Sequence, residues 1–299
     1  MPTSARPVFG AFLLGALTIA ACSTHGGVSF RSAAPPAHSA SIGSSAAASA
    51  PRPAHVVVVV EENHSANQIL GSAQAPYLNS LARAGLDLTD MHAITHPSEP
   101  NYLALFSGST HRVSSDACPL RLRGRTLAGE LRAAGLSFRG YAESLPSAGF
   151  AGCSAGEYAR KHAPWTDFGA LPRSLGQPFS AFPADFARLP TVSFVVPNLM
   201  HDMHDGTVRQ GDTWLRTHLG AYVHWAKRHN SVLIVTWDEN DGAAGNRIAS
   251  ILVGAGIPAR HDGQHLTHYS LLRSIEDVYG LPAIGAARHA TPIRAWRAG

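Results

Sequence analysis

Three segments of the chain consist of a continuous apolar run that ends abruptly in acidic, amide or imidazole side chains. The segments are 56–65, 191–205 and 231–241. An uninterrupted β-branched run such as Val56 to Val60 is typical of a strand buried on both faces, as in a parallel sheet covered by helices. Ligands of such sheets bind beyond the carboxyl ends of the strands. The pattern therefore predicts that the chemistry of this protein lies where the three runs end.

Helical and strand periodicities alternate through the rest of the chain. We expect strands at 86–94, 136–142 and 248–253, and helices at 75–84, 102–106, 127–134, 214–228 and 269–279. Gly85, Gly135 and Gly280 are placed to end three of these helices. Ser98 or Glu99 is expected to cap the helix over 102–106. The alternation predicts a three-layer α/β fold, with helices on both faces of a mainly parallel sheet.

Composition agrees with one sizeable folded domain, which we expect at 55–299. The chain has 299 residues, of which 45% are hydrophobic and 15% are charged. The formal net charge is +4, but there is no block of consecutive basic residues and no interleaved aromatic pattern. A nucleic-acid partner is therefore not expected.

The N-terminal residues are typical of a targeting segment. Arg6 precedes an apolar stretch at 8–21 that is too short to span a membrane comfortably. Cys22 follows small residues and resembles the lipidated cysteine of a bacterial lipobox, so we expect a signal peptide at 1–22. The alternative is an ordinary secretory signal cut near Ala21. Either interpretation predicts an exported protein, and the lipobox predicts attachment to the membrane of the cell envelope through a lipid anchor.

The segment that follows differs in composition from the expected domain. Residues 23–54 are rich in Ser, Ala, Pro and Gly and have no sustained apolar periodicity, which predicts a flexible tether. Of the three cysteines, Cys118 and Cys153 lie in the domain. In an oxidising compartment these two are expected to form a disulfide, whereas two unpaired thiols are the weaker alternative.

Acidic and amide side chains after two of the apolar runs are candidate metal ligands. They are Glu62 and Asn63 after the first run, and Asp238 and Glu239 after the third. Either pair alone is more typical of solvated acids or helix caps. Ser98, between a strand and a helix, is the candidate nucleophile, and a nearby metal could activate it. A structural N-cap is the alternative role for this serine.

Histidines supply a second group of candidates. His201, Asp202 and His204 follow the second apolar run, and His268 precedes the last helix. These side chains could form a second metal site or a phosphate-binding cluster, and a histidine could protonate a leaving group. Because the chain has 17 histidines, clusters by chance are common.

Together these residues resemble the bacterial phosphoesterase family, which contains acid phosphatases and phosphatidylcholine-type phospholipases C. The resemblance covers about residues 55–285 and rests on the motifs at 62–65, 98–102, 158–162, 197–206, 237–239 and 268–272. It implies an alkaline-phosphatase-like fold and a divalent metal held by Glu62, Asn63, Asp238 and Glu239, with Ser98 bridging to the metal as nucleophile.

The resemblance also implies roles for side chains around that centre. His201, His204 and His268 would occupy the region where other superfamily members hold a second metal, and would act in catalysis. Asn101, Lys161 and His162 would bind substrate. The metal could be Mg, Ca, Mn or Zn, because oxygen-rich ligation suits the first three and nearby histidines suit the last.

These inferences favour a metal-dependent phosphomonoesterase of the acid-phosphatase type that acts through a phosphoserine at Ser98. The phospholipase branch usually has Glu-Asn-Arg-Ser-Phe-Asp after the first strand, whereas this chain has Glu-Asn-His-Ser-Ala-Asn at 62–67. A phospholipase C acting on phosphodiesters is the alternative. A catalytically inactive relative that binds an anionic ligand of the cell envelope is the second alternative.

Overall fold

A computed structural model describes residues 20–21, 26–27 and 52–296. The lipidation site predicted at Cys22, and nearly all of the predicted signal peptide and tether, lie outside the described residues. Within the described part of the chain, no helix is both long enough and apolar enough to cross a bilayer.

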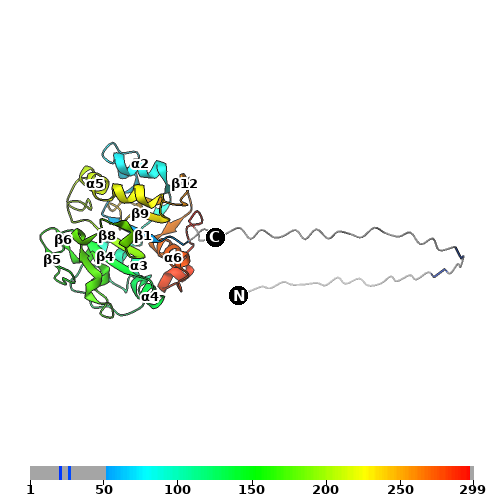
Figure 1. Ribbon diagram of the computed structural model, residues 1–299, viewed down its shortest axis with the longest axis horizontal. Coiled ribbons are helices and arrows are strands. Elements are labelled where there is room, and N and C mark those ends of the chain that lie inside the picture. The colour runs from blue at the N-terminus through cyan, green and yellow to red at the C-terminus, as the bar shows by residue number, and fades with distance from the viewer. Residues whose placement is uncertain (1–19, 22–25, 28–51, 297–299) are drawn as a thin grey trace, which may run out of the picture. The chain divides into compact units, whose positions relative to one another are not determined.

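An eight-stranded sheet forms the centre of the folded body (Figure 1). Its strand order is β12-β2-β11-β9-β1-β8-β4-β7. The bounds are β1 His55–Glu61, β2 Leu86–Leu88, β4 Phe138–Ala142, β7 Gly176–Pro178, β8 Val192–Val196, β9 Ser231–Trp237, β11 Ser250–Gly254 and β12 Arg260–Asp262. Only β11 runs against its neighbours in this sheet. The prediction of a mainly parallel sheet is confirmed.

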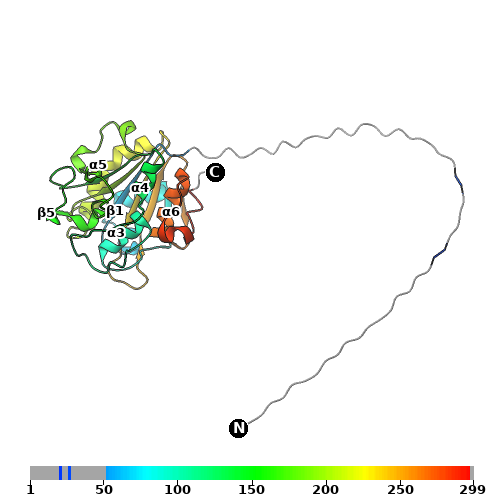
Figure 2. The same ribbon diagram turned by 90° about the horizontal axis from the view of Figure 1, so that it is seen from below.

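Helices cover both faces of the sheet, as predicted (Figures 1 and 2). Helices α2 and α5 pack together on one face, and α3 packs against α4 and α6 on the other. The bounds are α1 Ala66–Ile69, α2 Pro76–Ala84, α3 Ser98–Ser107, α4 Leu127–Ala133, α5 Val208–Ala226 and α6 His268–Tyr279. Because both faces are covered, the five valines of β1 are almost completely buried, which explains their uninterrupted apolar pattern.

The strand register brings the polar ends of the apolar runs together. In β1, Glu61 pairs with Trp237 of the parallel strand β9, so Glu62 and Asp238 leave the sheet side by side. Strand β8 lies on the other side of β1 and directs the chain toward Asp202. The carboxyl edge of three neighbouring strands therefore delivers three acidic side chains to one place.

Two predicted strands are each interrupted in the structure. The segment 86–94 bends at Thr89 and Asp90, so that it forms β2 and then β3 (Met91–His92). The segment 248–253 divides between β10 (Arg247–Ile248) and β11. A second sheet, of order β10-β3-β13, includes β13 (Leu266–Thr267). The apolar pattern does not predict either break. In each segment one half is buried in the large sheet and the other half is buried in the small sheet, so the apolar residues continue across the break.

Helix α3 begins earlier than predicted. Its first turn contains Ser98, and Pro97 occupies the N-cap position, so the expectation that Ser98 or Glu99 caps this helix from outside is wrong. Helix α5 also begins earlier, at Val208, and Thr207 caps it. Elsewhere, the region 118–188 contains short 3₁₀ turns and the two-residue strands β5 (Ser154–Ala155) and β6 (Tyr158–Ala159).

Candidate active site

The Ser98 hydroxyl lies between two carboxylates at the carboxyl edge of the sheet. Its Oγ lies 3.0 Å from Glu62 Oε2 and 3.2 Å from Glu239 Oε1, so its one proton can be donated to either carboxylate. Residues 36 and 141 positions apart are thereby brought together, and Ser98 and Glu62 are fully buried. The hydroxyl is also in the first turn of α3, where backbone N–H groups and the helix dipole favour negative charge.

Asp238 joins this group through the backbone of Asn63. The Asn63 N–H donates to Asp238 Oδ1 at 3.1 Å, and Asn63 has φ of 55°, a left-handed conformation that asparagine tolerates better than most residues. This turn redirects the chain immediately after Glu62. Asp238 Oδ2 is buried and has no hydrogen-bond partner among the residues that the structure describes.

A buried imidazole lies behind Glu62. His162 places Nε2 at 3.1 Å from Glu62 Oε1 and Nδ1 at 3.2 Å from Asp202 Oδ2. Its ring stacks on Tyr102, whose hydroxyl donates to Glu62 Oε1 at 2.6 Å. Glu62 is therefore contacted by a serine and a tyrosine of α3 and by a histidine of the loop at 160–162.

A positively charged side chain lies on the rim of this cluster. Lys161 Nζ is 3.0 Å from Asp116 Oδ2 and 3.2 Å from His204 Nε2. Burial lowers the pKa of Lys161, but the carboxylates of Glu62, Asp116 and Asp238 outweigh burial and hold the pKa above its usual value. Lys161 therefore remains charged and is near enough to the acids to interact with them electrostatically.

Burial dominates the protonation of the site. It is the largest cause that raises the pKa of Glu62 to about 7, that of Asp202 to about 7, and that of Asp238 well above its usual range. Repulsion from Glu62 and Glu239 adds to the shift at Asp238. Burial also lowers the pKa of His162 to about 4, so this imidazole is neutral at neutral pH. Without a cation the buried acids of the cluster therefore favour their protonated forms.

These groups fit a divalent cation. Neighbouring buried like charges are costly unless a proton or a cation compensates them. The unpartnered Asp238 Oδ2 and the shared hydroxyl of Ser98 are oxygen donors directed into the cluster. One group of side chains with metal-ligand spacing, within 4.8 Å of one another, consists of Glu62, His162 and Asp202. The predicted ligands and this second group share Glu62, so the cluster offers both oxygen and nitrogen ligation.

Several predicted site residues contact other partners. His201 Nδ1 lies 2.9 Å from Glu143, and its ring stacks on Trp214. The buried His268 places Nε2 2.9 Å from the Trp237 carbonyl oxygen, which leaves only Nδ1 free. Of the three expected histidines, only His204 contacts a charged group of the cluster rim.

Asn101 has a structural position. Its Oδ1 accepts from the N–H groups of Ile94 and Thr95, and its Nδ2 donates to the carbonyls of Thr95 and Pro97. These four bonds saturate the side-chain amide, which is fully buried. The substrate-binding role expected for Asn101 stays a prediction, and in the structure no polar group of its side chain remains free. Its bonds instead fix the loop that leads into Ser98.

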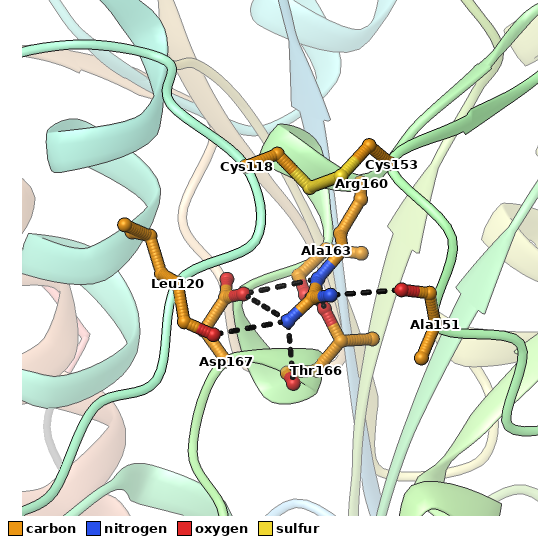
Figure 3. The surroundings of a disulfide bond; sticks show 8 residues. All are labelled: Cys118, Leu120, Ala151, Cys153, Arg160, Ala163, Thr166 and Asp167. Carbon is orange, nitrogen blue, oxygen red and sulfur yellow. Dashed lines mark hydrogen bonds and ion pairs between the residues drawn. A yellow bond between two sulfur atoms is a disulfide. The ribbon is translucent and has the colours of Figure 1, made fainter.

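The loop that carries His162 is held by a disulfide and a buried arginine (Figure 3). Cys118 and Cys153 are joined, as predicted, across 35 positions of sequence. Arg160 Nη2 lies 2.8 Å from Asp167 Oδ1, and its guanidinium also donates to the carbonyls of Leu120 and Ala151. Arg160 therefore holds the fold of this loop, and it contacts none of the acids around Ser98.

Three contributors to the site were not identified from the sequence. Tyr102 lies in the motif at 98–102, but the sequence predicts only that it begins a helix. His96 Nδ1 lies 2.5 Å from Glu239 Oε2, and Asp116 contacts both Lys161 and the backbone N–H of Glu99. His96 lies only two residues before Ser98, which is a local signal, whereas the position of Asp116 depends on the path of a long loop.

The fold is that of the alkaline phosphatase superfamily. The chain is similar to a protein of that superfamily from Vibrio parahaemolyticus, with a TM-score of 0.54 at 13% identity over 82% of this chain and 72% of that one. It is also similar to the phosphonate monoester hydrolase of Agrobacterium radiobacter, with a TM-score of 0.53 at 13% identity over 82% and 79% of the two chains. The Phosphoesterase family profile matches residues 72–282, and the chain belongs to this family. It is a hydrolase that acts on phosphoric ester bonds.

Two relatives illustrate the range of the family. The chain is 49% identical over 251 residues to the phosphatidylinositol-3-phosphatase of Mycobacterium tuberculosis, which covers 83% of this chain and 84% of the relative. It is 31% identical over 228 residues to an acid phosphatase of Aspergillus fumigatus, covering 69% of this chain. The chain spans about half the length of that fungal enzyme, 51%.

Proposed function

We propose that the protein is a metal-dependent phosphomonoesterase of the acid-phosphatase type, with Ser98 as its nucleophile. The observation that carries this proposal is the position of Ser98 Oγ within hydrogen-bond distance of both Glu62 and Glu239. A buried hydroxyl between two acids is poorly placed for a purely structural role, because a single acceptor would satisfy its one proton. It is well placed to lose that proton when the acids also hold a cation.

The proposed metal ligands are Glu62, Asn63, Asp238 and Glu239, with Ser98 beside them. A bound divalent cation would lower the pKa of the Ser98 hydroxyl and offset negative charge on a phosphoryl oxygen. Ser98 Oγ then forms a bond to phosphorus while the bond from phosphorus to the ester oxygen breaks. The departing alcohol takes up a proton, and the products of this first step are phosphoserine and the free alcohol.

The rim residues supply charge and protons. Lys161 is a positive group for the non-bridging oxygens of the substrate. The neighbouring His204 is the candidate acid for the departing oxygen and the candidate base for the water that attacks phosphoserine. In this second step water adds to phosphorus, the bond to Ser98 Oγ breaks, and the serine recovers its proton as inorganic phosphate leaves.

The substrate class follows from the relatives as well as from the site. Fungal relatives at about 31% identity are acid phosphatases, and the relative at 49% identity is a phosphatidylinositol-3-phosphatase. Both names describe removal of a terminal phosphate from an alcohol. We infer that this chain acts on phosphomonoesters and that a phosphoinositide monophosphate is a candidate substrate among them.

Replacement of Ser98 tests the proposal directly. In Ser98→Ala we expect kcat to fall roughly 10³-fold or more, because the nucleophile is lost. The assay compares a chromogenic phosphomonoester, phosphatidylinositol 3-phosphate and a phosphocholine diester, each with and without added divalent cation. The control is Ser80→Ala, a serine of α2 whose Oγ bonds only the Tyr77 carbonyl.

Each result of that assay has a defined meaning. Activity of Ser98→Ala near that of the parent protein contradicts the proposal. A parent protein that hydrolyses only the phosphocholine diester is a phospholipase C instead. A parent protein that binds phosphate and metal but turns over none of the three substrates supports the inactive relative.

We also propose that the protein is exported and anchored to the envelope membrane through Cys22. The disulfide between Cys118 and Cys153 supports an oxidising compartment, because such bonds are rare in the cytosol. Metabolic labelling with a fatty acid should mark the parent protein and fail to mark Cys22→Ser. Equal labelling of both contradicts the anchor, and absence of label in both favours an ordinary secretory signal.

A further inference from the structure

A second cluster of ligand-type side chains lies in the small sheet. Asp90 is in the bend that separates β2 from β3, His92 is in β3, and His265 directly precedes β13. Strands β3 and β13 pair in parallel, with Leu266 opposite Met91, so His265 is brought beside Asp90. One potential ligand atom from each of the three side chains lies within 4.8 Å of the other two.

The Asp90 carboxylate lies between the two imidazoles. Its Oδ1 is 2.8 Å from His92 Nε2, and its Oδ2 is 3.1 Å from His265 Nδ1. The two rings are 4.8 Å apart between centroids. Ligands of a tetrahedral ion with bonds near 2.0 Å lie about 3.3 Å from one another. Small side-chain rotations therefore convert this arrangement into a three-ligand metal site.

The contact of His92 Nδ1 fixes the tautomer of this imidazole, and therefore whether Nε2 presents a lone pair to Asp90. His92 Nδ1 is 2.5 Å from the carbonyl oxygen of Gly245, and a carbonyl can only accept, so Nδ1 carries a hydrogen. A neutral His92 then presents the lone pair of Nε2 to a carboxylate oxygen. Two electron pairs at this distance require a cation between them, either a proton on Nε2 or a metal ion.

This orientation is the one that metal-ligating histidines usually have. Their second ring nitrogen donates to a backbone carbonyl or a carboxylate, which fixes the tautomer and directs the lone pair at the metal. The exposed side chains of His265 and Asp90, with 71% and 40% of their surfaces accessible, leave room for water as a further ligand.

We propose that Asp90, His92 and His265 form a binding site for a divalent transition metal ion such as Zn²⁺. Two imidazoles and one carboxylate favour Zn²⁺, Co²⁺ or Ni²⁺ over Mg²⁺ and Ca²⁺, which prefer oxygen ligands. The site shares no ligand with the cluster around Ser98. It does not depend on the function proposed above, because it rests on different side chains.

From its position, this site would stabilise the segments that lead into the active site. Strand β3 leads to the loop before Ser98, and β13 leads directly into α6, which begins at His268. Gly245, the partner of His92, lies in the loop that follows Glu239. A metal ion here would connect three segments that each continue into the carboxyl edge of the sheet, so its main effect is expected on stability.

Metal stoichiometry tests the proposal. The purified protein is freed of metal and titrated with Zn²⁺ by calorimetry, with thermal unfolding followed in parallel. We expect His265→Ala to bind one Zn²⁺ equivalent fewer than the parent, or to bind that equivalent roughly 100-fold more weakly. The Zn²⁺-dependent rise in Tm should shrink accordingly. Because His265 is largely exposed, this substitution leaves the fold intact.

A matched control separates this site from adventitious binding by surface histidines. His261 is similarly exposed, at 73%, and also contacts a carboxylate, Asp87, but among the described residues no second imidazole is paired with that carboxylate. His261→Ala should keep the parent stoichiometry. Asp90→Asn should behave like His265→Ala, and Co²⁺ should give a visible absorption band in the parent that both variants lose.

The outcomes are unambiguous. Equal Zn²⁺ stoichiometry and affinity in the parent, His265→Ala and Asp90→Asn would overturn the proposal, and so would equal losses in His261→Ala and His265→Ala. Failure of the proposed phosphatase function would leave the difference between His265→Ala and His261→Ala unchanged. The two proposals can therefore fail separately.

Discussion

Two buried groups of charges in this molecule are compensated in different ways. In the loop joined by the disulfide, the guanidinium of Arg160 faces the carboxylate of Asp167 and several carbonyl oxygens. At the edge of the sheet, Glu62 and Glu239 flank the hydroxyl of Ser98 and Asp238 binds the adjoining backbone of Asn63, while the cation near them, Lys161, lies on the rim. Both regions are buried, yet only the first has a counter-charge at its centre.

The difference separates a structural polar network from a functional one. A buried ion pair with satisfied hydrogen bonds adds order to a loop without offering reactivity. A cluster of acids without a central cation has raised pKa values and is ready to bind one, which is typical of active sites. Both regions bury charged groups. The active site is distinguished by an excess of acids without a cation at the centre.

Removal of one acid from the cluster should have the largest effect. In Glu62→Gln we expect a loss of activity of roughly 10⁴-fold, equivalent to about 5 kcal/mol in the activation free energy, because metal binding is impaired. In the metal-free state the same variant should be at least as stable as the parent, since one repelling carboxylate is gone. Activity, bound metal and Tm are measured together.

A control and a contradicting result define that prediction. Glu130→Gln removes an acid whose partner is the exposed Arg125, and it should leave activity unchanged. If metal-free Glu62→Gln were several degrees less stable than the metal-free parent, Glu62 would have a structural role like that of Asp167. The contrast between the two regions would then be lost.

Removal of the cation from the other region should reduce stability. Arg160→Met leaves the buried carboxylate of Asp167 without its counter-charge, and we expect the free energy of unfolding to fall by about 3–5 kcal/mol. The matched control is Arg125→Met, which breaks an ion pair whose arginine is 47% exposed and should cost about 1 kcal/mol or less. Denaturant unfolding measures both, and similar losses for the two variants would contradict the assignment of Arg160 as a buried structural cation.

Much of the central architecture could be predicted because its signals are local. Each buried parallel strand carries its apolar run and its polar end in one short segment, as Val56 to Glu62 shows. The strand register then makes Glu62 and Asp238 neighbours without any further information. Ser98 could be found because it stands at a junction between a strand and a helix.

Other parts of the site depend on tertiary structure that short segments do not encode. His162 lies against Glu62 because the disulfide and Arg160 fold the loop at 118–167. The sequence predicts a substrate-binding role for His162, but it does not predict these contacts with acids. Asn101 belongs to a recognisable motif, but only the path of the preceding loop shows that its amide is saturated. The break at Asp90 was invisible because apolar residues continue on both sides of it.

A third buried acid differs from both regions, because no described residue forms an ion pair with it and its nearest cations act only at longer range. Glu276 in α6 is fully buried, Oε1 accepts from the N–H of Ile284 at 3.0 Å, and burial raises its pKa to about 8. The folded state therefore binds a proton that the unfolded state releases above pH 4.5, so stability should fall as pH rises from about 5 to 8. In Glu276→Gln, which resembles the protonated acid, this part of the pH dependence should disappear, and the variant should gain up to a few kcal/mol over the parent at pH 8. Unfolding at pH 5 and pH 8 tests this, with the exposed Asp277→Asn as the control, and equal pH dependence in parent and Glu276→Gln would show that Glu276 is ionised in the folded protein.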